Sequence, residues 1–196
     1  MFVPHIFRSS GKKTGKRLSL LLAAALLFVS LPLSASAEEE EPVLRTETLD
    51  CASFTGDEAN EEEGWSWKNA DKTLTLNDFL MLQEAEALLG IKLPADSTIV
   101  LAGENGNVLS GMGVSGCGIQ AEGDLTIEGG GALTITLANE ESASAFQGIQ
   151  CTGNLTFDLT DGQAGGVMVV VGPVTEGDCL GIAAAGNVTV SGGNIV

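Results

Sequence analysis

The sequence predicts an all-β protein folded as a right-handed parallel β-helix. Three segments share the pattern Gly-Ile-x-small-x-Gly-(Asp/Asn)-aliphatic-Thr-apolar, and they begin at Gly118, Gly148 and Gly181. Their spacings of 30 and 33 residues indicate one structural unit repeated with loops of variable length. Within each copy apolar and polar residues alternate, which is the period of two that defines a strand. Such a solenoid presents long outer faces rather than one deep site.

The first 37 residues have the composition of a secretory signal peptide. Basic residues at positions 8, 12, 13, 16 and 17 precede an apolar run from Leu18 to Leu33, and Ala35-Ser36-Ala37 supplies the small residues that a signal peptidase reads. The run of 16 residues is shorter than the ~20 that a spanning helix needs, which disfavours a retained membrane anchor. We expect cleavage after Ala37, a secreted or cell-surface location, and no membrane insertion of the mature chain.

Removal of this segment leaves a strongly acidic chain. Four basic residues remain against 26 acidic ones, so the net charge changes from −17 to −22. Binding to nucleic acid or to an anionic membrane needs Lys and Arg, so neither partner is expected. The single histidine, His5, lies in the signal, which excludes His-dependent triads and His-ligated metals from the mature chain. Lys and Arg are absent after Lys92, so β-eliminating lyase chemistry lacks its usual cation.

The elements before the repeats are predicted as follows. Residues 38–63 form an acidic lead-in that we expect to be flexible, with one short strand near Val43 to Leu49. The ordered domain spans residues 64–196 and includes a half-buried strand at 72–76, where polar and apolar residues alternate. Residues 79–89 are ambiguous, since their apolar spacing suits a short helix and an irregular insertion is the alternative.

The repeats supply the remaining elements. A degenerate copy begins at Gly90, so repeats start near residues 90, 118, 148 and 181. Each copy is predicted to form two short strands joined by a Gly-Asp or Gly-Asn bend, and third strands are predicted at 132–137 and 166–171. Parallel stacking at ~4.8 Å aligns Ile119 with Ile149 and Ile182 in a continuous core. The units are too short for propeller blades, and the last copy is incomplete, which indicates a fragment of a longer repeat protein.

The chain has four cysteines, Cys51, Cys117, Cys151 and Cys179. Disulfides are permitted in a secreted protein, and three pairings are possible. The cysteines occupy different positions within the repeat, which disfavours a ladder of bridges. Cys151 aligns with Ala121 and Ala184, and we expect a small, buried, unpaired thiol there.

The motifs of the ordered region resemble a known group of proteins. The segments are Trp65-Ser66-Trp67, Thr73 to Asn77, Leu93 to Asn105, and the Gly-Ile-x-x-x-Gly-Asp-Leu-Thr-Ile copies. Together they look like the secreted β-helical repeat proteins of gut and soil Firmicutes, which are grouped with clostridial carbohydrate-binding β-helix domains. The resemblance covers residues 64–196 and rests on core and corner positions. It implies calcium and an acidic plant polysaccharide as ligands, by analogy of fold.

Three groups of residues could carry a function. Asp124, Asn154 and Asn187 should stack at one corner, where their oxygens could coordinate Ca²⁺, and the alternative is a ladder of side chains bonded to neighbouring backbone. Trp65 and Trp67 lie at i and i+2, so they form either a shelf for sugar rings or a cap on the N-terminal end of the core.

The third group is a row of outward threonines, Thr126, Thr156 and Thr189. Their hydroxyl groups could contact a ligand, and the alternative is that threonine occurs there only because it is a good strand former. The outward positions that differ between the coils are the remaining candidates for ligand binding, namely Gln120, Glu122, Gln150 and Thr152.

These observations predict a non-catalytic secreted module that binds a polysaccharide or a cell-wall component, with Ca²⁺ as a candidate cofactor. A structural or adhesin stalk of a bacterial surface protein is the alternative. A glycoside hydrolase is the third hypothesis, and its two carboxylates would come from Asp124, Asp158 and Asp161.

Overall fold

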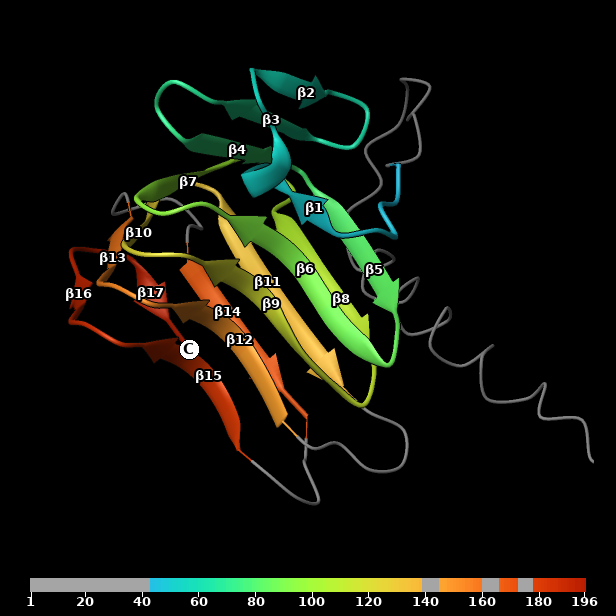
Figure 1. Ribbon diagram of the computed structural model, residues 1–196. Helices are drawn as coiled ribbons and strands as arrows, with labels where there is room; N and C mark the ends of the chain where they lie inside the picture. The colour runs from blue at the N-terminus through green and yellow to red at the C-terminus, as the bar shows by residue number, and fades with distance from the viewer. Residues whose placement is uncertain (1–42, 139–144, 160–165, 173–177) are drawn as a thin grey trace, which may run out of the picture. The chain divides into compact units, whose positions relative to one another are not determined.

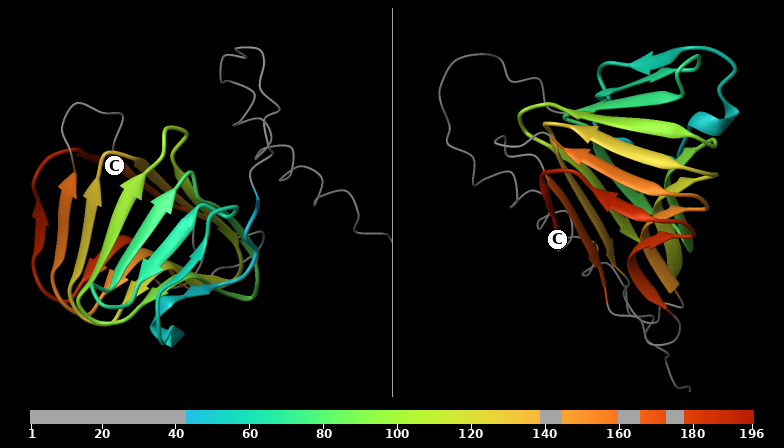
Figure 2. Two further views of the ribbon diagram at one scale, coloured as in Figure 1. Left: turned by 90° about the horizontal axis from the view of Figure 1, so that it is seen from above. Right: turned by 90° about the vertical axis from the view of Figure 1, so that its left-hand side faces the viewer.

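The computed structural model describes residues 43–138, 145–159, 166–172 and 178–196. In this part the chain runs through repeated circuits of three strands, one in each of three sheets, and successive circuits stack as coils (Figures 1 and 2). The predicted parallel β-helix is therefore confirmed. The predicted signal peptide and Asp161 lie outside the described residues.

The sheets are named here by the order in which a circuit crosses them. Sheet 1 has seven strands, β2 (Glu58–Asn60), β3 (Trp65–Lys68), β4 (Thr73–Asn77), β7 (Ser97–Ala102), β10 (Leu125–Gly129), β13 (Leu155–Leu159) and β16 (Val188–Val190). Sheet 2 has five, β5 (Leu80–Glu84), β8 (Asn107–Met112), β11 (Ala132–Ala138), β14 (Gly166–Val171) and β17 (Asn194–Ile195). Sheet 3 has five, β1 (Leu49–Asp50), β6 (Ala87–Leu93), β9 (Ser115–Ala121), β12 (Ala145–Cys151) and β15 (Cys179–Ala184).

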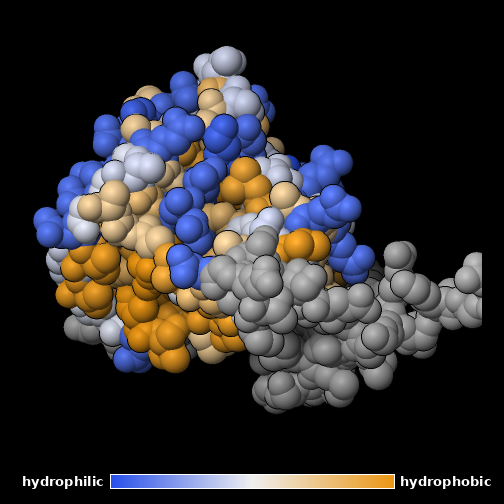
Figure 3. Space-filling view, turned by 60° about the horizontal axis from the view of Figure 1, so that its bottom comes forward, coloured by the Kyte–Doolittle hydropathy of each residue, from blue (hydrophilic) through white to orange (hydrophobic). Residues whose placement is uncertain are grey.

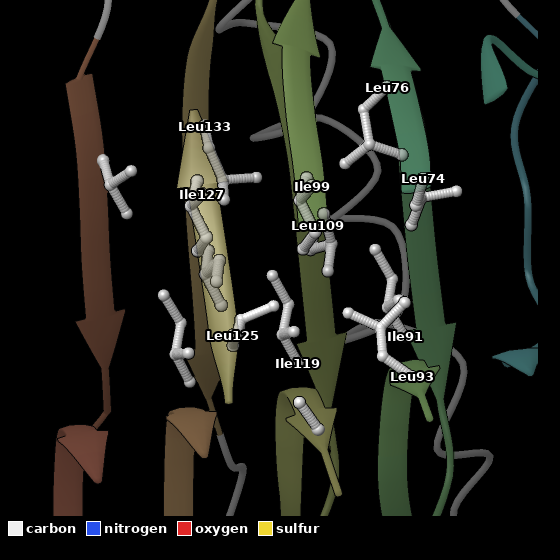
Figure 4. Close-up of a cluster of buried hydrophobic side chains, with 14 of the residues drawn as sticks. Leu74, Leu76, Ile91, Leu93, Ile99, Leu109, Ile119, Leu125, Ile127 and Leu133 are labelled. Atoms are coloured by element: carbon white, nitrogen blue, oxygen red, sulfur yellow. The ribbon is translucent and has the colours of Figure 1, made fainter. Parts of the chain in front are cut away.

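Register within the sheets follows the sequence repeat. Ile119 pairs with Ile91 on one side and with Ile149 on the other, and Ile149 pairs with Ile182. Because equivalent residues stack directly, their inward side chains form continuous columns, and the aliphatic core lies between the three sheets (Figure 4). The predicted inward positions are confirmed, since Ile119, like Ile149, has no exposed surface.

The glycines that open the motifs at Gly118 and Gly148 are required by packing between sheets. A Cβ at Gly148 would lie 2.1 Å from Val169 Cγ1 and 2.5 Å from the Gly181 carbonyl oxygen. A Cβ at Gly118 would lie 2.7 Å from Ile135 Cγ2. Side chains of sheet 2 thus occupy the space beside sheet 3 that any side chain at this position would fill. The following isoleucine can then turn inward in every coil.

Two expectations for the N-terminal part are corrected. Residues 79–89 form neither a helix nor an irregular insertion, because β5 and the start of β6 are regular strands paired with β8 and β9. The lead-in predicted for residues 38–63 is part of the fold from Arg45 onward: Arg45 bridges to Met81, Leu49 pairs with Ile91, and Leu49 is fully buried. The predicted strand near 43–49 is reduced to Leu49–Asp50.

The N-terminal end of the solenoid is covered by antiparallel strands. Strand β3 pairs antiparallel with β4, and β2 pairs antiparallel with β3. Trp65 lies opposite Leu76 and Trp67 lies opposite Leu74, so both indoles face the core. A short 3-10 turn, η1 (Cys51–Ser53), contributes the buried Cys51 nearby. The parallel part of the helix thus begins at a closed end.

Candidate functional site

A column that contains four polar residues and ends at an alanine runs along the outer face of sheet 3. Register places Asp50, Lys92, Gln120, Gln150 and Ala183 side by side on consecutive strands. The Gln120 Nε2 donates a hydrogen bond to Gln150 Oε1 at 3.3 Å. Each glutamine can both donate and accept hydrogen bonds, so the pair retains unused groups that point away from the core.

The neighbouring corner adds the other two predicted binding residues. Glu122 follows β9 and Thr152 follows β12, and both side chains are exposed. The Glu122 N–H donates to the Leu93 carbonyl oxygen at 3.2 Å, and the Thr152 N–H donates to the Ala121 carbonyl oxygen at 3.3 Å. These bonds continue the ladder into the corner, so Glu122 and Thr152 sit on adjacent coils. The structure therefore brings Gln120, Gln150, Glu122 and Thr152 together, and we call these four residues the polar strip.

Asp124, Asn154 and Asn187 form a hydrogen-bonded ladder at the same corner. Asp124 Oδ1 accepts from the Asn154 backbone N–H at 2.7 Å, and the Asn154 side-chain amide reaches the two Asp124 oxygens at 3.2 and 3.1 Å. Asn154 Oδ1 accepts from the Asn187 N–H at 3.0 Å. The hydrogen bond from the Asn154 backbone N–H lowers the pKa of Asp124, and the bonds from the Asn154 side-chain amide lower it further.

This ladder explains the second glycine of the motif. A Cβ at Gly153 would lie 2.1 Å from Asp124 Oδ1, and one at Gly186 would lie 2.6 Å from Asn154 Oδ1. The Asx side chain of one coil therefore rests against the glycine of the next. In the described parts of the chain, no group of three or more His, Cys, Asp or Glu side chains is arranged to hold a metal ion. The geometry matches the predicted alternative of side chains bonded to neighbouring backbone.

The tryptophan pair is placed in the core rather than on the surface. Trp67 is 1% exposed and Trp65 is 9% exposed. Trp65 stacks on Phe54 with ring centroids 5.8 Å apart, and its Nε1 donates to Glu63 Oε2 at 2.8 Å. Arg45 Nη1 bonds the same carboxylate oxygen at 2.6 Å. Rings that are this buried cannot stack a sugar, so the shelf interpretation is corrected in favour of the cap.

The threonine row on sheet 1 is longer than the repeats indicate. Register continues the row from Thr126, Thr156 and Thr189 to Thr98 and Thr73. Thr98 and Thr73 were not predicted as members of the row because their coils depart from the motif. The alternation of polar and apolar residues in strands 73–77 and 97–102 is the signal that could have revealed them.

The carboxylates considered for hydrolysis are distributed over two surfaces. Asp158 lies on the outer face of sheet 1, where it pairs with Glu128, whereas Asp124 belongs to the corner ladder. Glu128 and Asp158 are neighbours because of the register between β10 and β13, and this pairing was not predicted from the sequence. Both belong to a solvated outer face beside the threonine row.

The four cysteines are free thiols. Cys151 is 2% exposed and pairs in register with Ala121 and Ala184, which confirms the buried, unpaired thiol predicted there. Burial raises the pKa of Cys51 and of Cys117 to about 12. These thiols are structural rather than reactive, because the thiolate is the nucleophilic form.

No family model matches the sequence, and no curated protein or solved structure matches it significantly. Across the described residues, none of the helices is long and apolar enough to cross a membrane.

Proposed function

We propose that the protein is a secreted, non-catalytic module that binds a polysaccharide along the polar strip. The observation that carries this proposal is the register of Gln120 with Gln150 beside the adjacent Glu122 and Thr152. Amide, carboxylate and hydroxyl groups offer the mixture of donors and acceptors that sugar hydroxyls require. Gln120 and Gln150 stand on neighbouring strands ~4.8 Å apart, and Glu122 and Thr152 follow directly after these strands. An extended chain can therefore contact several of the four residues at once.

The charge of the chain indicates which polysaccharides suit the strip. Lys92 lies next to Gln120 in the outer column, and no Lys or Arg follows it in the sequence. A single cation beside the strip, in a chain whose net charge is −22 without residues 1–37, offers little attraction to polyuronates. Neutral plant or cell-wall polysaccharides are therefore the preferred ligands, and an acidic polysaccharide would need bridging Ca²⁺.

The test is a glycan array followed by titration calorimetry, with Ca²⁺ and with a chelator. We expect binding of a neutral polysaccharide. The double variant Gln120→Ala, Gln150→Ala should weaken it at least about tenfold, since two hydrogen-bonding side chains of the polar strip are lost. The matched control is Thr134→Ala with Thr136→Ala, two outward positions on β11 of sheet 2. Equal weakening by both pairs would contradict this location. A glycan array that shows no binding would favour the alternative function, a structural or adhesin stalk.

A further inference from the structure

The corner between β7 and β8 contains a chemically reactive pair of residues. Asn105 is the one asparagine in the chain that a glycine follows. Its side chain is exposed, and Gly106 has a positive φ of 84°, a conformation that favours glycine. Asparagine is among the thermolabile residues. Because Gly106 has no Cβ, the side-chain carbonyl carbon of Asn105 can approach the Gly106 nitrogen without steric hindrance.

Asp78 holds Asn105 from the same corner of the preceding coil, between β4 and β5. Asp78 Oδ1 accepts from the Asn105 backbone N–H at 2.8 Å, and Asp78 Oδ2 accepts from Asn105 Nδ2 at 3.2 Å. The fit is close, because a Cβ at Gly103 would overlap Asp78 Oδ1. We call these two hydrogen bonds the Asp78 clasp. The clasp holds the side-chain amide of Asn105 toward the preceding coil.

We propose that Asn105 is a site of spontaneous deamidation and that the Asp78 clasp sets its rate. The Gly106 nitrogen bonds to Asn105 Cγ, the Cγ–Nδ2 bond breaks, and Nδ2 leaves as ammonia with the proton from Gly106. Water then opens the cyclic imide at either carbonyl carbon, which gives aspartate or isoaspartate. Attack requires Cγ and the nitrogen to reach bonding distance, so the reaction proceeds when the clasp opens locally.

Water, the only co-reactant, has access to this corner. Hydrophilic side chains cover much of the face seen in Figure 3, although apolar side chains gather at one side of it. Asn105 and its neighbour Glu104 are likewise exposed to solvent. The imide can therefore be hydrolysed without unfolding of the core.

The product cannot restore the clasp. A carboxylate at position 105 has no side-chain donor for Asp78, and it places a second negative charge beside it. Isoaspartate also adds one carbon atom to the backbone. Two residues later, Asn107 Oδ1 accepts from the Phe79 N–H at 3.0 Å, so the added atom lies between two anchors to consecutive residues of the preceding coil. Deamidation should therefore loosen this corner irreversibly.

The first test is peptide mapping by mass spectrometry on the full chain after incubation at neutral and at mildly alkaline pH. We expect aspartate and isoaspartate at position 105, formed faster at the higher pH because the attacking nitrogen must lose its proton. Asn154 and Asn187 are internal references, since leucine and valine follow them, and they should stay intact over the same period. An intact Asn105, or equal deamidation at all three positions, would overturn the proposal.

The second test removes the clasp. Asp78→Gly should accelerate deamidation of Asn105 about fivefold, because loss of the two hydrogen bonds raises the population of the free amide. Glycine suits the positive φ of 56° at this position. Asp96→Gly is the matched control, since Asp96 has a φ of 59° and lies at a different corner, between β6 and β7. An unchanged rate in Asp78→Gly, or an equal increase in Asp96→Gly, would overturn the role of Asp78.

Hydrogen exchange gives a readout that needs no variant. In protein deamidated at position 105, the Phe79 amide should lose protection, because its bond to Asn107 belongs to the loosened corner. The Leu155 amide, which donates to the Asn187 carbonyl oxygen at 2.8 Å, should exchange as before. Equal protection of the Phe79 amide before and after deamidation would contradict the predicted loosening.

Discussion

The side chain of Asn107 is hydrogen-bonded to three coils of the solenoid. Its Oδ1 accepts from the Phe79 N–H at 3.0 Å, and its Nδ2 donates to the carbonyl oxygens of Ala102 and Ala132, each at 3.0 Å. Asn107 is 1% exposed, and it stands at the start of β8 where an apolar residue would continue the inward column. A single amide therefore satisfies one buried donor and two acceptors at a corner.

Asn107→Ala should lower the free energy of unfolding by about 2–3 kcal/mol, because it leaves buried backbone groups without partners. Urea unfolding followed by circular dichroism measures the loss. Asn77→Ala is the control, since Asn77 is an exposed asparagine at the end of β4. Comparable losses in the two variants would contradict the role assigned to Asn107.

Gly148→Ala should destabilise the protein by about 1–3 kcal/mol, because the added Cβ overlaps Val169 Cγ1 at 2.1 Å and forces the core to shift. The same motif position in the last coil is Gly181, where the nearest atom to an added Cβ is Val169 Cγ1 at 3.9 Å. Gly181→Ala should therefore be tolerated. The comparison is made on thermal and urea midpoints, and two equally damaging substitutions would show that conformational freedom, rather than space, fixes this glycine.

The fold could be predicted because its determinants are repeated. Alternation and the Gly-Ile period predict Ile119, Ile149 and Ile182 in one column, and register confirms this. The first coil was harder to predict, since Leu80 and Leu88 occur in a segment that suits helical spacing but pairs as strands with β8 and β9. There, pairing with the next coil overrides the local pattern.

The candidate site was only partly predictable, because the sequence gives the direction of a side chain but not its neighbours. Gln120 and Gln150 were expected to face outward, and they do. Trp65 and Trp67 were correctly placed on one side of a strand, yet the side proved to be the core, because antiparallel strands cover this end. Pairing between Glu128 and Asp158 depends on register between coils whose intervening loops differ in length.

Acid should weaken the N-terminal cap through Glu63. Burial by itself would raise the pKa of Glu63, but hydrogen bonds from Trp65 and Arg45 and the charge of Arg45 outweigh it and lower the pKa below the ordinary 4.5. The ionised carboxylate therefore contributes stability above the ordinary pKa, and this contribution is lost as the pH falls through the lower folded-state value. Glu63→Gln should flatten the acid limb of a plot of urea midpoint against pH.

The control for this measurement is Glu62→Gln, which neutralises an exposed glutamate one residue earlier. It should leave the acid limb as steep as in the unmodified protein. An acid limb that is the same in all three proteins would show that the contacts of Glu63 with Arg45 and Trp65 contribute nothing to stability.

Alkaline pH should destabilise the fold through its buried thiols. Burial raises the pKa values of Cys51 and Cys117 from the ordinary 9.0 to about 12, so above pH 9 the unfolded chain loses these protons while the folded chain keeps them. Their contribution is complete below the ordinary pKa and is lost between about 9 and 12, at up to about 1.4 kcal/mol per pH unit for each thiol. The chain has no tyrosine, so no phenol titrates in the same range. Urea unfolding at several alkaline pH values measures this loss. The free energy of unfolding should decline less steeply with pH for the double variant Cys51→Ala, Cys117→Ala than for the unmodified protein, whatever stability the two substitutions cost at neutral pH. Parallel declines would show that the two thiols ionise as readily in the folded chain as in the unfolded chain.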